Sequence, residues 1–311
     1  MGRLRDDGHA ILYISHKLHE ICAIADRYVV CRDGTTVGSG LMAETSRDQL
    51  IRLMVGRPID QGLPTRSPRA GPEALRFDGL WRKDESANIT LTIRQGEILG
   101  IYGLVGAGRS EVMQALFGIG SPDGVGVLPD DSEVRIRTIS GPLNLKVAYV
   151  PEDGQRQGAV LPLPIQKKVG LVRLHALSRH GFKSNSRARV TAQHWMETLT
   201  IRTSGASDSM EELSDGGQKQ VALAKWLQTV PKVLILDEPT KGIDVGSKAA
   251  VYKIISELAQ QGLAIILVSS DLPEVLGIAD REAVMRRGRI KAFFERIDAT
   301  SEALVLAATD G

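Results

Sequence analysis

Residues 103–110 read GLVGAGRS and combine three glycines with a cation and a hydroxyl. Glycines let the backbone turn so that several N–H groups point at one anion, and a following helix adds the positive end of its dipole. The apolar run 98–102 before the loop is typical of a buried strand, and residues 111–117 have helical spacing. A glycine-rich loop alone is also compatible with a plain turn, but strand, loop and helix in this order predict a phosphate-binding site.

The loop and the helix start supply the candidate nucleotide contacts, which are Gly103, Gly106, Ala107, Gly108, Arg109, Ser110 and Glu111. The Ser110 hydroxyl stands where it can ligate a Mg²⁺ ion that bridges two phosphates. Arg109 is unusual, because such loops usually carry Lys, a compact point charge, whereas Arg presents a wider planar fork. We expect nucleotide binding to survive this exchange more easily than efficient turnover.

A second set of chemical groups closes the apolar run 233–236, which is followed by Asp237 and Glu238. The first carboxylate suits a Mg²⁺ ion, and the second suits the orientation of an attacking water. Between this run and the glycine loop, residues 213–220 read LSDGGQKQ. Ser214 and the N–H groups of Gly216 and Gly217 would form an anion site at the start of a helix that begins with Gln218.

This order of motifs resembles the ATP-binding cassette (ABC) ATPases, and specifically the two-cassette subunits of bacterial importers for simple sugars of the ribose, xylose and galactose type. The resemblance covers essentially the whole chain. It is carried by GEILG at 96–100, GAGRS at 106–110, VPED at 150–153, LAKWL at 223–227 and DEPTKGIDVGSK at 237–248. The fold that it implies is α/β: a P-loop NTPase cassette with a RecA-like parallel sheet core, an antiparallel β subdomain and a helical subdomain at about 160–228.

The resemblance also implies roles for individual residues. Glu238 and Ser270 would be catalytic, with Ser270 at the position of a histidine that contacts the γ-phosphate and the attacking water. Glu152 stands where cassettes have a glutamine that senses Mg²⁺, and Asp244 follows in the GxD turn. Asp215 replaces a glycine, so its carboxylate would cost about 1 to 4 kcal/mol beside a γ-phosphate unless it turns outward.

An internal repeat sets the expected domain organisation. Residues 8–20 align without a gap on residues 262–274, a shift of 254 positions, and the same shift pairs Asp26 with Asp280. A repeat of this length indicates two copies of one domain. We therefore expect a C-terminal remnant of a first cassette at 1–61, a Pro/Gly/Ser-rich linker at 62–72 and a complete second cassette at 73–311.

The first copy would begin at about 73 − 254 = −181, so we expect the chain to be a fragment that lacks roughly 180 residues of its first cassette. The remnant includes His16, the counterpart of Ser270. Because the remnant has no phosphate loop of its own, we interpret His16 as a structural residue.

Composition narrows the function classes. The chain has 39 basic and 37 acidic residues, a net charge of +2, which argues against a dedicated nucleic-acid binder. No apolar run approaches the roughly 20 residues of a membrane span, and no signal peptide opens the chain. Cys22 and Cys31 lack zinc-ligand spacing, and we expect them to be buried apolar filler.

Two further features leave alternatives open. Trp81 either stacks on adenine or packs in the core. Residues 166–190 carry basic residues and no acidic residue, which favours a solvated helical face over a surface for anionic lipid or an acidic partner. These basic residues are Lys167, Lys168, Arg173, Arg179, Lys183, Arg187 and Arg189.

The combined interpretation is an ATP-binding and ATP-hydrolysing subunit that uses ATP and Mg²⁺ to energise monosaccharide import. Its expected partners are membrane-spanning permease subunits, a second cassette for the composite ATP site and, indirectly, a periplasmic or lipoprotein sugar-binding protein. Its expected location is the cytoplasmic face of the plasma membrane, as a peripheral protein.

Two alternatives remain. One is a nucleotide-binding cassette with little or no hydrolysis that acts as a structural half of the transporter, given Arg109, Asp215 and Ser270. The other is a soluble cassette ATPase that works on ribosomes or DNA, against which the near-neutral charge speaks. Which sugar is carried belongs to the partners.

Overall fold

The computed structural model describes residues 4, 7–14, 18–32, 35–46, 49, 50, 53, 71–82, 86–120, 122–128, 132–152, 163–173, 178, 179, 182–243 and 245–309. The chain divides into two compact units, residues 1–62 with 243–250, and residues 63–242 with 251–311. The finer division into remnant, linker and complete cassette stays a prediction, and His16 lies outside the described residues.

The first unit contains a helix and a hairpin. Helix α2 (Leu18–Ile24) precedes β1 (Arg27–Arg32), which pairs antiparallel with β2 (Thr35–Leu41). Among the described residues of 1–62, Val30 and Leu50 are the buried apolar side chains. The expectation of buried cysteines was wrong, because Cys22 and Cys31 are both exposed. A hairpin this small buries one face, and Cys31 follows Val30 onto the opposite one.

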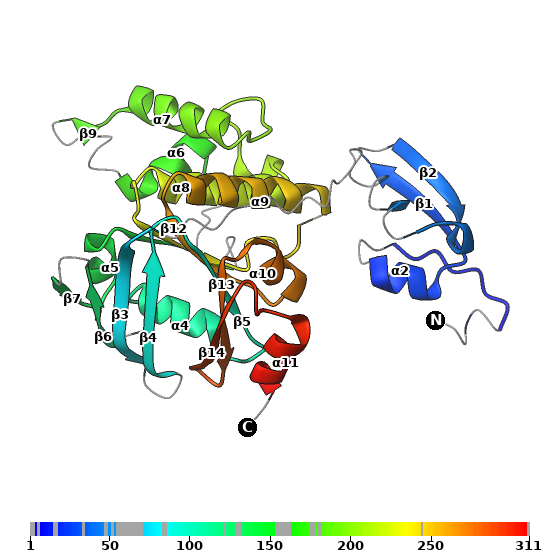
Figure 1. Cartoon of the computed structure of the whole chain (residues 1–311). Helices are drawn as coiled ribbons and strands as arrows, with labels where there is room; N and C mark the ends of the chain where they lie inside the picture. Colours follow the sequence, from blue (N-terminus) through cyan, green and yellow to red (C-terminus); the bar gives the residue numbers. More distant parts are fainter. Residues whose placement is uncertain are drawn as a thin grey trace. The chain divides into compact units, whose positions relative to one another are not determined.

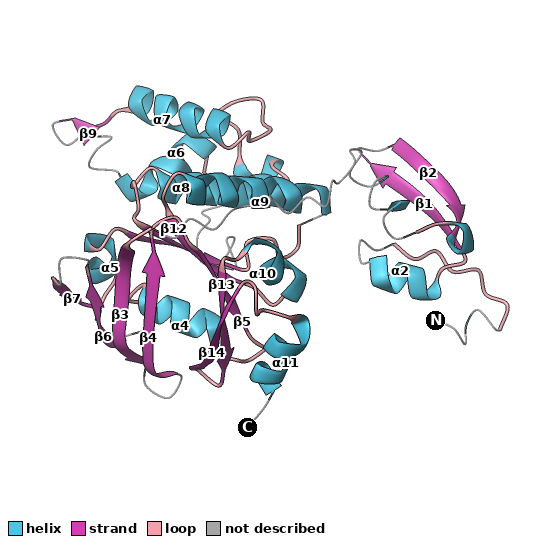
Figure 2. Cartoon of the chain, in the orientation of Figure 1, coloured by secondary structure: helices cyan, strands magenta, loops and turns pink. Residues whose placement is uncertain are grey.

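The second unit is built on a six-stranded sheet (Figure 2). Its strands stand in the order β14-β13-β5-β12-β11-β8, and β14 pairs antiparallel with β13 while the other pairs are parallel. Every residue of β5, β8, β11 and β12 is buried, as expected of parallel strands covered on both faces. The strands are β5 (Ile98–Tyr102), β8 (Val147–Val150), β11 (Val233–Asp237), β12 (Ala264–Val268), β13 (Arg281–Arg286) and β14 (Arg289–Glu295).

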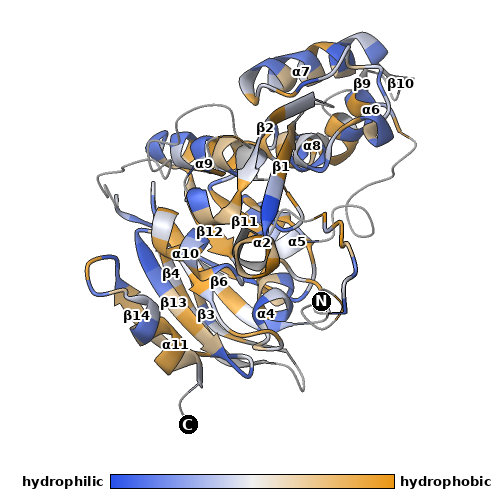
Figure 3. Ribbon diagram, turned by 90° about the vertical axis from the view of Figure 1, so that its right-hand side faces the viewer, coloured by the Kyte–Doolittle hydropathy of each residue, from blue (hydrophilic) through white to orange (hydrophobic). Residues whose placement is uncertain are grey.

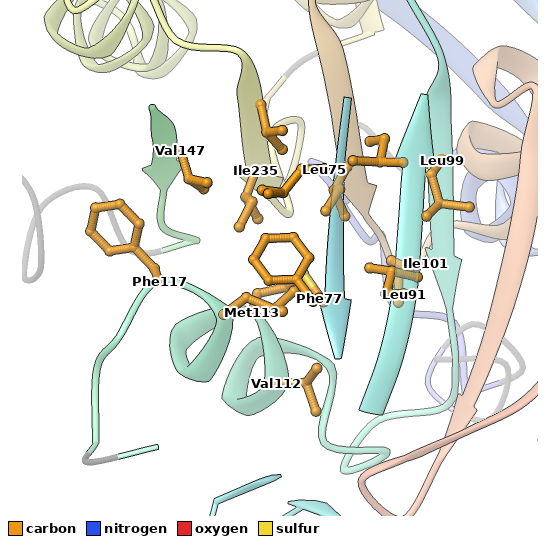
Figure 4. Close-up of a cluster of buried hydrophobic side chains, with 14 of the residues drawn as sticks. Leu75, Phe77, Leu91, Leu99, Ile101, Val112, Met113, Phe117, Val147 and Ile235 are labelled. Atoms are coloured by element: carbon orange, nitrogen blue, oxygen red, sulfur yellow. The ribbon is translucent and has the colours of Figure 1, made fainter. Parts of the chain in front are cut away.

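A four-stranded antiparallel sheet forms a second layer, in the order β4-β3-β6-β7. Its strands are β3 (Glu73–Arg82), β4 (Ser86–Arg94), β6 (Asp123–Val127) and β7 (Glu133–Arg135). Helix α4 (Arg109–Leu116) packs against both β3 and β11. Figure 4 shows the resulting core, in which Phe77, Met113 and Ile235 come from the antiparallel sheet, the helix and the parallel sheet. This core fixes the axis of α4, and therefore the place of its first turn.

The remaining helices cover these sheets or pack on one another (Figure 1). They are α5 (Ser140–Asn144), α6 (Ile165–Val169), α7 (Asn185–Thr198), α8 (Asp215–Leu227), α9 (Val245–Gln260), α10 (Leu272–Ile278) and α11 (Ser301–Thr309), with a two-stranded pair β9 (Ser178–Arg179) and β10 (Phe182–Lys183) before α7. Helix α6 packs against α7 and α8, and the hydrophilic colour along α7 in Figure 3 matches its exposed positions. Within the described residues, no helix combines the length and apolar character that a membrane crossing requires.

The expectation of a solvated basic face was wrong for Lys168, which is only 1% exposed. It stands three positions after the buried Ile165, on the same inner side of α6. Within the described residues its Nζ has no hydrogen-bond partner. Burial lowers the pKa of Lys168 to about 8, and the nearby charge of Lys225 acts in the same direction.

A buried acid lies near the start of β13. Glu282 is fully buried, and within the described residues both of its carboxylate oxygens lack a hydrogen-bond partner. Burial is the main cause that raises the pKa of Glu282 from 4.5 to about 7. Asp280 and Glu295 add to the rise, while Arg296 opposes it. We infer that the folded state holds Glu282 as a neutral acid over part of the pH range in which the unfolded chain ionises it.

Glu282 therefore makes stability depend on pH. Its contribution is fully present below the unfolded pKa and is lost as the pH rises through about 7. Glu282→Gln removes this loss. The free energy of unfolding of the variant, relative to that of the wild type, should therefore rise by about 2 kcal/mol when the pH increases from about 5 to about 8. Urea denaturation at both pH values measures the difference. Glu302→Gln, at an exposed position of α11, is the control, and equal pH dependence in both variants would refute the assignment.

Candidate functional site

Residues 103–108 connect β5 to α4 and leave open space at their tip. Gly106 and Gly108 have φ angles of 81° and 88°, in the left-handed region that favours glycine. A Cβ at Gly106 would meet no atom within 4 Å, whereas one at Gly103 would lie 2.6 Å from the Met285 carbonyl oxygen. The loop is therefore tightly packed at its base and open at Gly106.

The first turn of α4 can accept an anion. The residue before the helix, Gly108, offers no side-chain cap to its N–H groups. Glu111 is the acidic residue of this turn and is exposed, where the helix dipole favours a negative charge. The main-chain N–H groups of the first turn of α4 directly follow the open loop. This arrangement suits the binding of an oxyanion.

Asp237 lies beneath this loop at the end of β11 and is only 1% exposed. Its carboxylate accepts hydrogen bonds from the Ser110 hydroxyl at 3.0 Å and from the Tyr149 hydroxyl at 2.9 Å. Burial raises the pKa of Asp237 to about 6, which these two hydrogen bonds oppose and the charge of Glu152 reinforces. Burial and the neighbouring Asp237 also raise the pKa of Tyr149.

Glu238 is held from two sides. Its carboxylate accepts hydrogen bonds from the Ser270 main-chain N–H at 2.8 Å and from the Ser270 hydroxyl at 3.2 Å. Arg109 Nη2 lies 3.3 Å from Glu238 Oε1. The other guanidinium nitrogen, Nη1, is buried and, within the described residues, has no hydrogen-bond partner. Among the described residues, the Nη1 group of Arg109 therefore remains available to donate to a further acceptor.

Glu152 is fastened by two lysines at the end of β8. Lys241 Nζ lies 2.5 Å from the Glu152 carboxylate, and this hydrogen bond raises the pKa of Lys241. Lys219 Nζ donates to the Glu152 carbonyl oxygen at 3.0 Å. Glu152 therefore lies at the border of the Asp237 and Glu238 cluster, joined to it through these cations.

The turn at Ser214 forms a separate part of the site. Helix α8 begins at Asp215, three residues earlier than predicted, because Ser214 caps it: its hydroxyl accepts from the Gly217 N–H at 3.3 Å. Gly216 is buried in the first turn. Asp215 is exposed at the same turn.

The structure thus brings Arg109, Ser110, Asp237, Glu238 and Ser270 together, while Ser214 and Gly216 stand at the start of α8. Asp244 and the side chain of Trp81 lie outside the described residues.

Sequence reasoning missed Tyr149, Lys219 and the buried carboxylate of Glu274. Glu274 accepts hydrogen bonds from the Thr240 hydroxyl at 2.8 Å and from the Ser269 hydroxyl. Tyr149 is a single polar residue in the apolar run of β8, whereas Lys219 lies between Gln218 and Gln220, so no residue type or spacing distinguished either of them.

Comparison with known proteins identifies the family to which this architecture belongs. Residues 86–241 match the family model described as ABC transporter. The chain belongs to the ABC transporter family. Among curated relatives, this family member is 50% identical over 308 residues to the ribose import ATP-binding protein RbsA of Jannaschia sp. (strain CCS1). It is 47% identical over 306 residues to the ribose import ATP-binding protein RbsA 1 of Rhizobium meliloti (strain 1021).

Both alignments cover 98% of this ABC family member but only 59% and 61% of the two relatives. The chain thus spans about three fifths of their length. The resemblance to the sugar-importer subunits is confirmed by these relatives.

Solved structures confirm the predicted cassette fold. A nucleotide-free ATP-binding cassette from an ABC transporter has a TM-score of 0.64 and 19% identity, and covers 77% of this chain and 100% of its own. CbiO1 of Clostridium perfringens, part of the transporter complex cbiONQ, has a TM-score of 0.61 and 24% identity, with coverage of 76% and 93%.

The tight packing at the loop base yields a stability prediction for this ABC family member. Gly103→Ala places a Cβ 2.6 Å from the Met285 carbonyl oxygen and 2.9 Å from the Ala107 Cβ. The loop must shift, so we expect a loss of about 1 to 3 kcal/mol in the free energy of unfolding, measured by urea denaturation. Gly205→Ala, whose Cβ would meet only ordinary contacts, is the control. Equal stability of the two variants would contradict the described packing.

Proposed function

We propose that this chain binds ATP with Mg²⁺ and hydrolyses it, as the ATP-binding subunit that energises the import of ribose or a similar monosaccharide. One observation carries the proposal. Two adjacent residues at the start of α4, Arg109 and Ser110, reach two adjacent carboxylates at the end of β11, Glu238 and Asp237. A cation, a hydroxyl, a buried acid and a second carboxylate around an open glycine loop are the groups that phosphoryl transfer uses.

The residues fit a polyphosphate. The loop is open at Gly106, and the N-terminus of α4 carries no side-chain cap. Arg109 Nη1 is a buried donor that, among the described residues, lacks an acceptor. A phosphate oxygen would satisfy this donor, because a guanidinium binds phosphate through parallel N–H groups. Gly103, Ala107, Gly108 and Glu111 complete the loop and the first helical turn around it.

The residues also fit a Mg²⁺ ion. Ser110 Oγ and Asp237 Oδ1 are oxygen donors 3.0 Å apart, and Mg²⁺ is commonly held by one or two carboxylates together with substrate phosphates and waters. Ser110 and Asp237 would hold the ion on the protein side. When bound, the ion neutralises charge on the transferring phosphate. Glu152 would sense this charge from the end of β8.

Individual side chains have separate roles in the proposed hydrolysis. Glu238 orients the attacking water and accepts its proton, with Ser270 holding the carboxylate through its N–H and hydroxyl. Arg109 turns from Glu238 to the phosphate, which frees the Glu238 Oε1 lone pair for the water. Ser214 and Gly216 form the turn that closes over nucleotide held by a second cassette, together with Asp244.

The transported substrate and the partners follow from the relatives. The two named relatives are called ribose import ATP-binding proteins and are longer than this chain. We propose the same process here, with membrane-spanning permease subunits, a second cassette, and a periplasmic or lipoprotein sugar-binding protein that acts indirectly. The chain would work at the cytoplasmic face of the plasma membrane, where the permease presents its inner loops.

Single-turnover hydrolysis tests the proposal. We expect the purified chain to cleave the γ-phosphate of Mg-ATP, and Glu238→Gln to lower the rate by about 100-fold or more, since an amide cannot accept the proton of the water. Glu257→Gln, an exposed residue of α9, is the matched control and should leave the rate unchanged. Background rates in all three proteins would instead favour a nucleotide-binding module without catalysis.

A further inference from the structure

Lys219 on α8 lies where three parts of the second unit meet. Its Nζ donates hydrogen bonds to the Glu152 carbonyl oxygen at 3.0 Å and to the Glu238 carbonyl oxygen at 3.1 Å. Glu152 follows β8 and Glu238 follows β11, and these two strands are neighbours in the six-stranded sheet. One ammonium group thus connects helix α8, which Ser214 caps, to the ends of two core strands.

The main chain at Glu238 is strained and needs such support. Its φ angle is 48°, which costs a residue with a side chain about 1 to 2 kcal/mol. Three hydrogen bonds hold this conformation: the Glu238 N–H donates to the Val268 carbonyl at 2.9 Å, and its carbonyl accepts from the Lys241 N–H at 3.2 Å and from Lys219. The direction of the Glu238 side chain depends on this backbone conformation.

The energetic cost of placing a lysine here points to a specific role. Burial lowers the pKa of Lys219, although the carboxylates of Glu152, Asp237, Glu238 and Glu274 all act to raise it. A desolvated ammonium is energetically costly unless its donors are used, and Lys219 donates to the carbonyl oxygens of Glu152 and Glu238, whose carboxylates border the site. The ammonium is therefore bound to the main chain of the two residues whose carboxylates border the site.

We propose that Lys219 is a positioning residue for the proposed reaction: its ammonium fixes the main chain at Glu238 and Glu152 and thereby directs the Glu238 carboxylate toward Ser270 and the glycine loop. The inference rests on the proposed function, and it adds a residue that touches neither nucleotide nor water. It also links the start of α8 to the orientation of Glu238, because Ser214 caps the helix that carries Lys219.

Kinetics of the full chain separate this role from a merely structural one. Lys219→Met should lower kcat for ATP hydrolysis by about tenfold or more, because small misplacements of a reacting group are costly. The KM for ATP should stay within about twofold, since the phosphate contacts of the loop are untouched. Lys219→Arg keeps a charged donor and should recover most of kcat. Lys225→Met is the matched control on α8, where it removes a buried lysine whose ammonium lies over the Trp226 ring.

A crystal structure of Lys219→Met gives a result that does not depend on turnover. We expect the Glu238 carboxylate to leave the Ser270 N–H, which it meets at 2.8 Å in the wild type. A carboxylate that keeps this hydrogen bond, or a kcat equal to that of Lys225→Met, would overturn the proposal. Failure of the proposed function looks different: the wild type would then hydrolyse ATP no faster than Glu238→Gln, and the crystal structure would still decide the role of Lys219.

Discussion

Two contacts between the start of α4 and the end of β11 carry the architecture of the site. Ser110 donates to Asp237, and Arg109 pairs with Glu238. Asp237 and Glu238 are both buried, and isolated buried charges cost several kcal/mol. The contacts can form only because α4 is locked between the two sheets, with Met113 and Phe77 in the core that they share (Figure 4). Packing energy far from the site is what keeps a cation, a hydroxyl and two acids within hydrogen-bond distance.

This arrangement gives a physical reason for an arginine at position 109 of the loop. A guanidinium is a planar fork with several donors, so Arg109 can pair with Glu238 through Nη2 while Nη1 stays available. A lysine ammonium would present all of its donors from one nitrogen, without the fixed planar spacing of the guanidinium nitrogens. The ion pair also supplies a counter-charge for Glu238, whose backbone is held at a positive φ angle. Arg109 is thus integrated into its surroundings, in agreement with the sugar-importer pattern of the sequence.

Much of the fold could be predicted from the sequence, because apolar runs and helical spacing directly encode β5, β11, β12 and α4. The candidate loop, Asp237 and Glu238 were found for the same reason: their motifs are local. Contacts that depend on packing were not accessible. Tyr149 and Lys219 reach the site from separate elements. Lys168 lies on the inner side of a helix of five residues, which is too short to show a periodic pattern in the sequence. The prediction of buried cysteines was wrong, since Cys22 is exposed on α2 and Cys31 lies on the exposed face of a small hairpin.

The central claim is that the loop between Gly103 and Ser110 binds a polyphosphate that draws Arg109 away from Glu238. The most direct measurement is a crystal structure of the chain with Mg²⁺ and a non-hydrolysable ATP analogue, grown at a concentration at which calorimetry detects binding. The account predicts phosphate density against the N–H groups of residues 106–110, with an Arg109 nitrogen on a phosphate oxygen and Mg²⁺ near Ser110 and Asp237. No binding heat, together with an empty loop and an Arg109 still paired with Glu238, would contradict it.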